Sequence, residues 1–218
     1  MRNTTFWKII TAIELAVAAA VILLDLFLPT LVILCLIALS LLIRREHIHS
    51  LGFKRPQSWS RTAGIALAGA VSLQLFDIGI VMPILNRVTG TTIDYSGFAH
   101  LKGNLAQLLL LLALSWTLAA LGEEIVYRGY LQKLLAELFG SRLPGILLMV
   151  GVSSLLFGFA HTEQGLIGIV VTTLDALFFS WLKLKCGGNL WVTILAHGFY
   201  NSIGVLVFYF TGPFYGLW

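Results

Sequence analysis

Seven long apolar stretches follow one another along the chain and indicate its architecture. Each is a continuous run rich in Leu, Ala, Ile and Val, as in helices that cross a hydrocarbon core of about 30 Å. Transmembrane β-strands would instead show roughly ten-residue segments of alternating polarity. The pattern therefore predicts an all-α polytopic transmembrane helical bundle of about seven spans. The expected spans are residues 7–28, 30–43, 62–84, 104–132, 143–161, 165–183 and 189–211.

Composition agrees with a protein that is largely embedded in lipid. Of the 218 residues, 58% are hydrophobic and only 11% are charged, and no polar stretch is long enough for a separate soluble domain. We expect a single integral membrane domain. Within it, residues 1–100 would form N-terminal transmembrane helices with a basic amphipathic linker, and residues 101–211 the part that carries the polar motifs.

The Lys and Arg residues predict an orientation, because positively charged loops tend to stay in the cytoplasm. Only Arg87 and Lys102 fall on the expected external side, which puts the N-terminus in the cytoplasm and the C-terminus outside. This asymmetry and anionic lipids account for the net charge of +4 without any nucleic-acid partner. The expected cytoplasmic residues are Arg2, Lys8, Arg44, Arg45, Lys54, Arg55, Arg61, Lys133, Arg142, Lys183 and Lys185.

The fourth apolar stretch contains two adjacent acidic residues and an arginine, which are costly groups to place in hydrocarbon. Glu124 and Arg128 are four residues apart, with the acid first, a favourable spacing for an ion pair on one helix face. Glu123 would then face elsewhere, and a carboxylate in an apolar pocket is suited to act as a general base. The alternative is a charge network of all three residues that only fixes helix packing.

Two further polar pairs occur at helical spacing in later spans. His161 follows Phe157 by one turn, and Asn201 follows His197 by one turn on a single helix face. An imidazole and an amide arranged in this way are good hydrogen-bond donors to a developing oxyanion. His161 would share with Glu123 the task of holding a water molecule, as a second base or as a metal ligand. For either histidine alone, a bond to a backbone carbonyl of a neighbouring helix is the structural alternative.

These motifs, in this order, resemble those of the CPBP family of intramembrane endopeptidases, which is related to the type II CAAX prenyl proteases and is also called the Abi family. The resemblance covers roughly residues 100–205 and rests on residues 123–129, 157–161 and 197–201. Residues 51–59 resemble the amphipathic linker of bacterial members. The family is linked in bacteria to bacteriocin processing or self-immunity. The resemblance implies a helical membrane fold with an active-site cavity between helices.

For the site residues, the resemblance implies that Glu123 and His161 activate water for attack on a peptide carbonyl, while His197 and Asn201 stabilise the oxyanion. Family members have been described both as metalloproteases and as metal-independent glutamate proteases. Glu123, His161 and His197 could supply the three ligands of a catalytic zinc ion, but then another base would be needed, with Glu124 the nearest candidate. We favour Glu123 as the base, with no cofactor required, and keep a divalent metal such as zinc as the alternative.

A count of helical rise places Glu123 and His161 at different depths unless the fourth span stays in the bilayer to about residue 132. We nevertheless expect Glu123, His161 and His197 to form one cluster, reached from a cytoplasm-facing cavity. Asp77 and Asp175 would pair with cations or line this cavity, and Asp175 is a candidate partner of His197 or Arg128.

Two functions follow from the sequence. The first is an endopeptidase that cuts membrane-associated or lipidated peptides. The second is a non-catalytic membrane protein for bacteriocin self-immunity or ligand binding. The intact set of Glu123, His161, His197 and Asn201 favours the peptidase.

Overall fold

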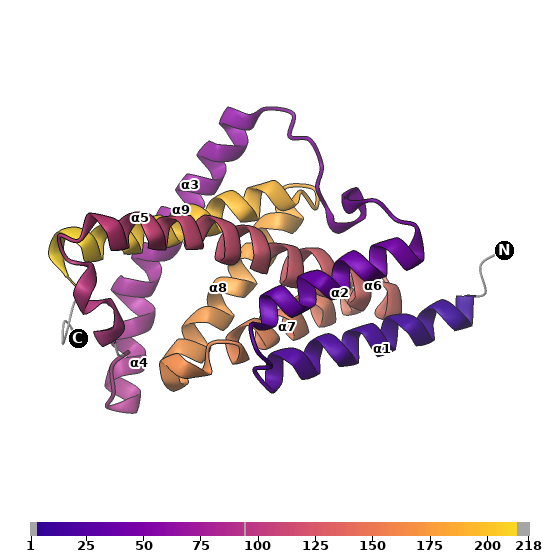
Figure 1. Ribbon diagram of the computed structural model, residues 1–218, viewed down its shortest axis with the longest axis horizontal. Helices are drawn as coiled ribbons and strands as arrows, with labels where there is room; N and C mark the ends of the chain where they lie inside the picture. Colours follow the sequence, from indigo (N-terminus) through magenta and orange to yellow (C-terminus); the bar gives the residue numbers. More distant parts are fainter. Residues whose placement is uncertain (1–3, 94, 213–218) are drawn as a thin grey trace.

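The computed structural model describes residues 4–93 and 95–212, and these residues form helices without any strand (Figure 1). Arg2, which was assigned to the cytoplasmic side, lies outside the described residues. Each of the seven apolar stretches is helical, which confirms the all-α transmembrane bundle. Five helices are long and apolar enough to cross a membrane, and two shorter ones are Pro29–Arg44 and Leu143–Phe159.

The first two helices form a hairpin at the side of the bundle. The hairpin consists of α1 (Thr4–Leu23) and α2 (Pro29–Arg44), and Pro29 provides the fixed backbone angle suited to a helix start. Arg44 at the end of α2 is buried and pairs with Glu14 on α1 and, at 2.9 Å, with Glu137. The sequence placed Arg44 among the basic residues of the cytoplasmic side. Its burial is explained by these two carboxylates, which supply the charge partners that a buried guanidinium needs.

A linker and two long helical rods follow the hairpin in the chain. Each rod is interrupted by a π-helical segment, whose hydrogen bonds run from residue i to i+5. The linker contains a short 3-10 turn, η1 (Ile48–Leu51). The first rod is α3 (Trp59–Phe76), η2 (Asp77–Val81) and α4 (Met82–Thr89). The 3-10 turn η3 (Ser96–Leu101) leads to the second rod, which is α5 (Leu105–Leu114), η4 (Ser115–Leu131) and α6 (Gln132–Phe139).

Three further helices follow in the part of the chain that the structure describes. They are α7 (Leu143–Phe159), α8 (Gly165–Lys185) and α9 (Leu190–Thr211), with the 3-10 turn η5 (Thr162–Gln164) between the first two. Asn104 and Asn189 are the N-caps of α5 and α9. Their side chains accept hydrogen bonds from the backbone N–H groups of Gln107 and Trp191.

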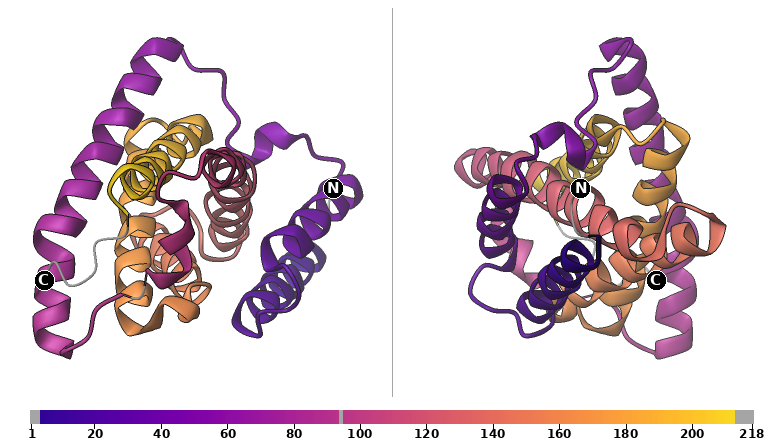
Figure 2. Two further views of the ribbon diagram at one scale, coloured as in Figure 1. Left: turned by 60° about the vertical axis from the view of Figure 1, so that its left-hand side comes forward. Right: turned by 90° about the vertical axis from the view of Figure 1, so that its right-hand side faces the viewer.

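The central helices are η4, α7, α8 and α9, with the α1–α2 hairpin on one side and the α3–α4 rod on the other (Figure 2). The start of α1 and the end of α9 lie at opposite ends of the molecule (Figure 1). The linker is held beside the α8–α9 turn, because Lys54 Nζ donates to the Gly187 carbonyl at 2.6 Å. The basic linker and the basic end of α8 therefore share one end of the bundle.

Candidate active site

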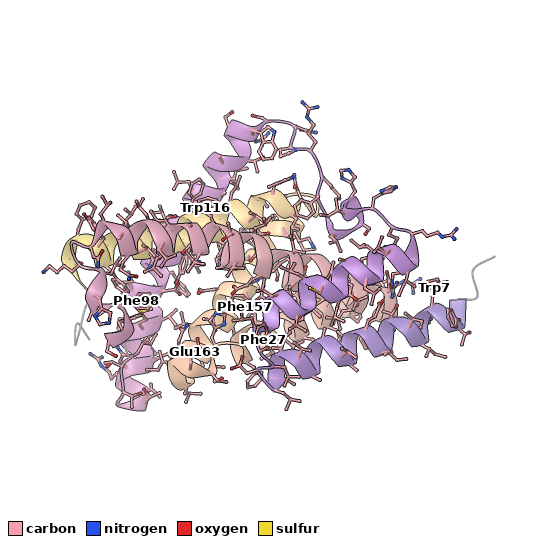
Figure 3. All side chains as sticks on the ribbon, in the orientation of Figure 1. Trp7, Phe27, Phe98, Trp116, Phe157 and Glu163 are labelled. Atoms are coloured by element: carbon pink, nitrogen blue, oxygen red, sulfur yellow. The ribbon has the colours of Figure 1, made fainter. Side chains whose placement is uncertain are left out.

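A cavity of about 640 Å³ lies among the central helices. Glu123, His161, His197 and Asn201 all line it, so the structure brings the predicted site residues from three helices to one space. Phe157 lies in the middle of the bundle, and Phe98 and Glu163 lie towards the end away from the linker (Figure 3). Polar and apolar side chains share the walls. Other lining residues are Gln74, Met82, Ile93, Tyr95, Leu111, Leu118, Gln164, Thr172, Asp175, Phe179, Tyr200, Val205 and Phe208.

Part of the cavity wall comes from segments away from the basic linker, whereas the sequence predicted entry from the cytoplasmic side. Its walls include Tyr95 and Phe98 from the segment before α5 and Glu163 from η5, whereas the basic linker lies at the opposite end (Figure 1).

Burial and the nearby Asp77 and Asp175 carboxyl groups raise the pKa of Tyr95 to about 12. Tyr95 is therefore a neutral phenol in this wall at physiological pH.

The two adjacent glutamates on η4 have different surroundings. Glu124 is fully buried, whereas the side chain of Glu123 is 20% exposed and faces the cavity. They lie on a π-helical segment of seventeen residues, much longer than the usual single-turn bulges, which are frequent at functional sites. The second rod extends to Phe139, so Glu123 lies well inside the span, and it lines the same cavity as the two histidines.

Glu124 joins two buried groups on different helices. Its Oε1 atom is 2.9 Å from Arg128 Nη1, which confirms the predicted i,i+4 pair, and 3.0 Å from His197 Nδ1 on α9. The Arg128 guanidinium lies between two aromatic rings, 4.6 Å from the centre of Phe157 and 5.5 Å from that of Phe179. Glu124 and Arg128 therefore position His197 and do not themselves line the cavity.

The same geometry corrects the suggestion that Asp175 supports His197. Glu124 occupies Nδ1 of His197, and Phe179 stacks on the imidazole with centroids 5.2 Å apart and planes at 19°. Asp175 instead neighbours Asp77 and Tyr200, and it interacts electrostatically with Arg128, the other partner that the sequence suggested. Glu124, Asp175 and His197 lie on three different helices, far apart in the chain. The packing of η4 against α9 therefore decides which acid reaches the His197 ring.

His161 follows the end of α7 and is held by that helix. Its Nδ1–H donates to the Phe157 carbonyl oxygen at 2.8 Å, which leaves Nε2 outside this bond. The alternative considered from the sequence was a bond to a backbone carbonyl of a neighbouring helix, whereas the observed bond is to a carbonyl of the preceding helix α7. It does not compete with a chemical role, because the bonded nitrogen is not the one left available. Phe157 contacts both imidazoles, with ring centres 4.7 Å from His161 and 6.1 Å from His197.

Glu123 and His197 are close but not directly bonded. Their nearest atoms, Oε2 and Nε2, are 3.9 Å apart, beyond the range of a hydrogen bond. A water or substrate oxygen at about 2.8 Å from both atoms fits such a separation. Asn201, one turn further along α9, lines the same cavity. The arrangement can thus hold a small oxygen species between an acid, two imidazoles and an amide.

Several side chains that support the site carried no distinguishing signal in the sequence. Trp116 on η4 packs against Gly198 and donates to Ser202 at 3.0 Å, and a Cβ at residue 198 would lie only 2.5 Å from the Trp116 ring. The sequence likewise gives no sign of the role of Phe179, since a phenylalanine in an apolar stretch is ordinarily a packing residue. Such residues are recognised only from their contacts.

Lys183 has a role that differs from its expected place in a basic cytoplasmic end. Its ammonium group donates to the Arg128 carbonyl oxygen and, at 3.3 Å, to Gln132 Oε1. Gln132 also donates to Ser153 and Ser180 at 3.2 and 2.9 Å. This network links α8 and α7 to the end of η4, directly behind Arg128.

Among residues 4–93 and 95–212, no three His, Cys, Asp or Glu side chains are placed to bind one ion. Nε2 of His197 is 3.9 Å from Glu123 Oε2, wider than the usual separation of two ligand atoms that share one zinc ion with bonds of about 2 Å. In this arrangement, these side chains therefore do not fit a zinc ion.

Comparison with protein families connects this geometry to a known class. A family model described as Type II CAAX prenyl endopeptidase Rce1-like matches residues 105–203, which contain all the predicted site residues. The match is consistent with the CPBP family and confirms the resemblance seen in the sequence. At the family level, it supports a CAAX protease-like peptidase of the membrane. Neither the curated proteins nor the solved structures give a match.

The different surroundings of the adjacent glutamates predict different effects on stability. Glu124→Gln leaves the buried Arg128 without its charge partner and should lower the free energy of unfolding by about 3 kcal/mol. Glu123→Gln, at the cavity wall, should change it by less than about 1 kcal/mol. Chemical unfolding of the two isosteric variants in the same detergent measures the difference. Equal losses would contradict the assignment of Glu124 as the supporting residue.

Proposed function

We propose that the protein is an intramembrane endopeptidase that hydrolyses peptide bonds of membrane-associated or lipidated peptides with a water molecule activated by Glu123 and His161. The observation that carries the proposal is the 3.9 Å gap between Glu123 Oε2 and His197 Nε2 inside a cavity that His161 and Asn201 also line. Hydrolysis of an amide requires a base, a group that orients the water and hydrogen-bond donors for the oxyanion. Glu123, His161, and the pair of His197 and Asn201 are suited to these roles.

The attack step uses the two groups whose proton acceptors face the cavity. Glu123 takes a proton from the water while the Nε2 lone pair of His161 orients it, and the water oxygen bonds to the carbonyl carbon of the peptide. The carbonyl π electrons move to oxygen. The resulting tetrahedral intermediate carries one negative charge, and protonated Glu123 then gives its proton to the departing amine as the C–N bond breaks.

The oxyanion is stabilised from α9. His197 donates through Nε2–H when its imidazole is protonated, while the Glu124 carboxylate accepts the hydrogen bond from Nδ1–H. The Asn201 amide provides the second donor, one helical turn away. Glu124 has a role like that of a carboxylate behind a catalytic histidine: it holds the ring in one orientation and balances its charge.

Replacing Glu123 tests the base. Glu123→Gln keeps size and polarity but cannot accept the proton, so hydrolysis should fall by about 10²- to 10⁴-fold. Mass spectrometry of membrane peptides from cells with the active protein or the variant identifies the products that depend on Glu123. Glu163→Gln, which removes an exposed carboxylate from the same cavity, is the matched control and should keep the rate within about 2-fold.

The same variant separates the peptidase from the non-catalytic alternative. An immunity phenotype that persists in Glu123→Gln cells, with cleavage abolished, would assign that phenotype to binding. Undiminished cleavage by Glu123→Gln would remove Glu123 from the mechanism altogether.

Replacing Asn201 tests the oxyanion donor. Asn201→Ala removes a hydrogen bond that strengthens in the transition state, so kcat should fall by about 10²- to 10³-fold while KM changes by less than about 3-fold. Steady-state kinetics with a cleaved peptide measure both constants. A raised KM with unchanged kcat would show that Asn201 only binds the ground state.

For the orientation, we propose a cytoplasmic N-terminus and an external C-terminus. The proximity of Lys54 to the α8–α9 turn supports this, because it gathers two basic segments at one end of the bundle. The cavity then opens towards the external side of the membrane.

Labelling of introduced cysteines tests this orientation. In a background with Cys35 and Cys186 replaced by serine, an impermeant maleimide should label Ser96→Cys in intact cells. It should label Ser58→Cys, in the linker, only after permeabilisation. The reverse pattern would invert the proposed orientation.

A further inference from the structure

A second polar cluster lies in the cavity beside the proposed hydrolytic residues. Asp77 on η2 is fully buried and Asp175 on α8 is 5% exposed. Their carboxyl groups are hydrogen-bonding neighbours, and the Tyr200 hydroxyl donates to Asp77 Oδ2 at 2.8 Å. Gln74, one turn before Asp77, and Asp175 line the cavity wall. The proposed mechanism uses none of these groups.

Acceptor atoms outnumber donors in this cluster. Asp77 Oδ1, Asp175 Oδ1 and Gln74 Oε1 are buried and receive no hydrogen bond from any donor in the described part of the protein. Two touching carboxyl groups share one proton, which cannot serve three acceptors and leaves the pair with about one negative charge. No Lys, Arg or His within residues 4–93 and 95–212 forms an ion pair with either aspartate.

Such a surplus points to a ligand with several donors and a positive charge. Buried polar atoms in proteins are nearly always hydrogen-bonded, and a buried charge is nearly always paired. An ammonium group carries three N–H donors and a guanidinium five, and neither has an acceptor. A structural tie between η2 and α9 would need only the Tyr200–Asp77 bond, and it would leave the remaining oxygens unexplained.

The cluster is close enough to the hydrolytic residues to contact the same peptide. Phe179 stacks on His197 and contacts the Tyr200 ring edge-on at 6.3 Å, so one aromatic ring separates the two groups. Tyr200 follows His197 by three residues, about 4.5 Å along the helix axis. An extended peptide advances about 3.3 to 3.6 Å per residue. A side chain one or two residues from the scissile bond therefore reaches the cluster.

We propose that Asp77, Asp175 and Gln74 form a specificity subsite that binds the cationic side chain of a Lys or Arg residue near the scissile bond of the substrate. This inference rests on the proposed peptidase function. The apolar walls of the cavity accept the alkyl stem of such a side chain, and the carboxyl pair receives its charged end.

Matched peptides test the subsite. Peptides with both termini blocked, identical except for Lys or norleucine at one position within three residues of the cleaved bond, are incubated with the purified protein in nanodiscs. Wild type should prefer Lys at one position by about 10-fold or more in kcat/KM, since hydrogen bonds to a charged group contribute most when desolvated. Asp175→Asn should reduce that ratio to about 2-fold or less while cutting the norleucine peptide at a near-normal rate.

Two further variants make the outcome specific. Glu163→Gln removes a carboxylate from the same cavity outside the cluster and should retain the Lys preference. Asp77→Asn repeats the test from the other aspartate if Asp175→Asn does not fold. The subsite proposal is wrong if the preference for Lys survives both aspartate substitutions. It is also wrong if the wild type cuts the Lys and norleucine peptides of each pair equally.

A binding measurement keeps this inference separate from the peptidase proposal. In the Glu123→Gln protein, the dissociation constants of the Lys and norleucine peptides should differ by about 10-fold or more, and adding Asp175→Asn should remove the difference. This result with a wild type that cuts no peptide would sustain the cationic site and reject the peptidase. Cleavage of both peptides with no difference in dissociation constant or in kcat/KM would instead support the peptidase and reject the cationic site.

Discussion

The buried carboxylate of Glu124 is the group on which the rest of the site depends. It pairs with Arg128 on its own helix and accepts a hydrogen bond from His197 on another, with none of the three side chains more than slightly exposed. In an apolar interior a charge without a partner is far more costly than in water. The approach of α9 to η4 is therefore fixed to the position that satisfies the carboxylate, and His197 is carried to the cavity with it.

This constraint explains how two adjacent glutamates acquire different properties. Glu124 is enclosed by Arg128 and His197, whereas Glu123, on the next residue, faces the open volume of the cavity. Aromatic rings extend the same support. Phe157 contacts Arg128 and both histidines, and Phe179 stacks on His197, so rigid apolar surfaces surround the groups that would handle protons. Water activation needs such walls, because they limit both the motion of the bases and the access of solvent.

Both π-helical segments coincide with buried acids: η2 begins with Asp77, and η4 carries Glu123 and Glu124. A widened helix displaces side chains from the lipid-facing and helix-facing positions of an α-helix, and such segments are frequent at functional sites. The cavity consequently has the proposed hydrolytic residues at one place and an acceptor-rich cluster at another. A peptide that spans both would present its backbone to the first and a side chain to the second.

The sequence alone determined the helical membrane architecture, because continuous apolar runs leave the backbone no other way to satisfy its hydrogen bonds in lipid. It also determined the Glu124–Arg128 pair, which needs only helical spacing, and the family resemblance, through motifs that are short and local. Tertiary packing decided which acid supports His197 and that Asp77 meets Asp175. Those contacts join helices distant in the chain, and a helix's residue order does not specify its rotation against another helix. For the same reason, the sequence places Arg44 among the cytoplasmic basic residues, and only the fold shows that it is buried in ion pairs with Glu14 and Glu137.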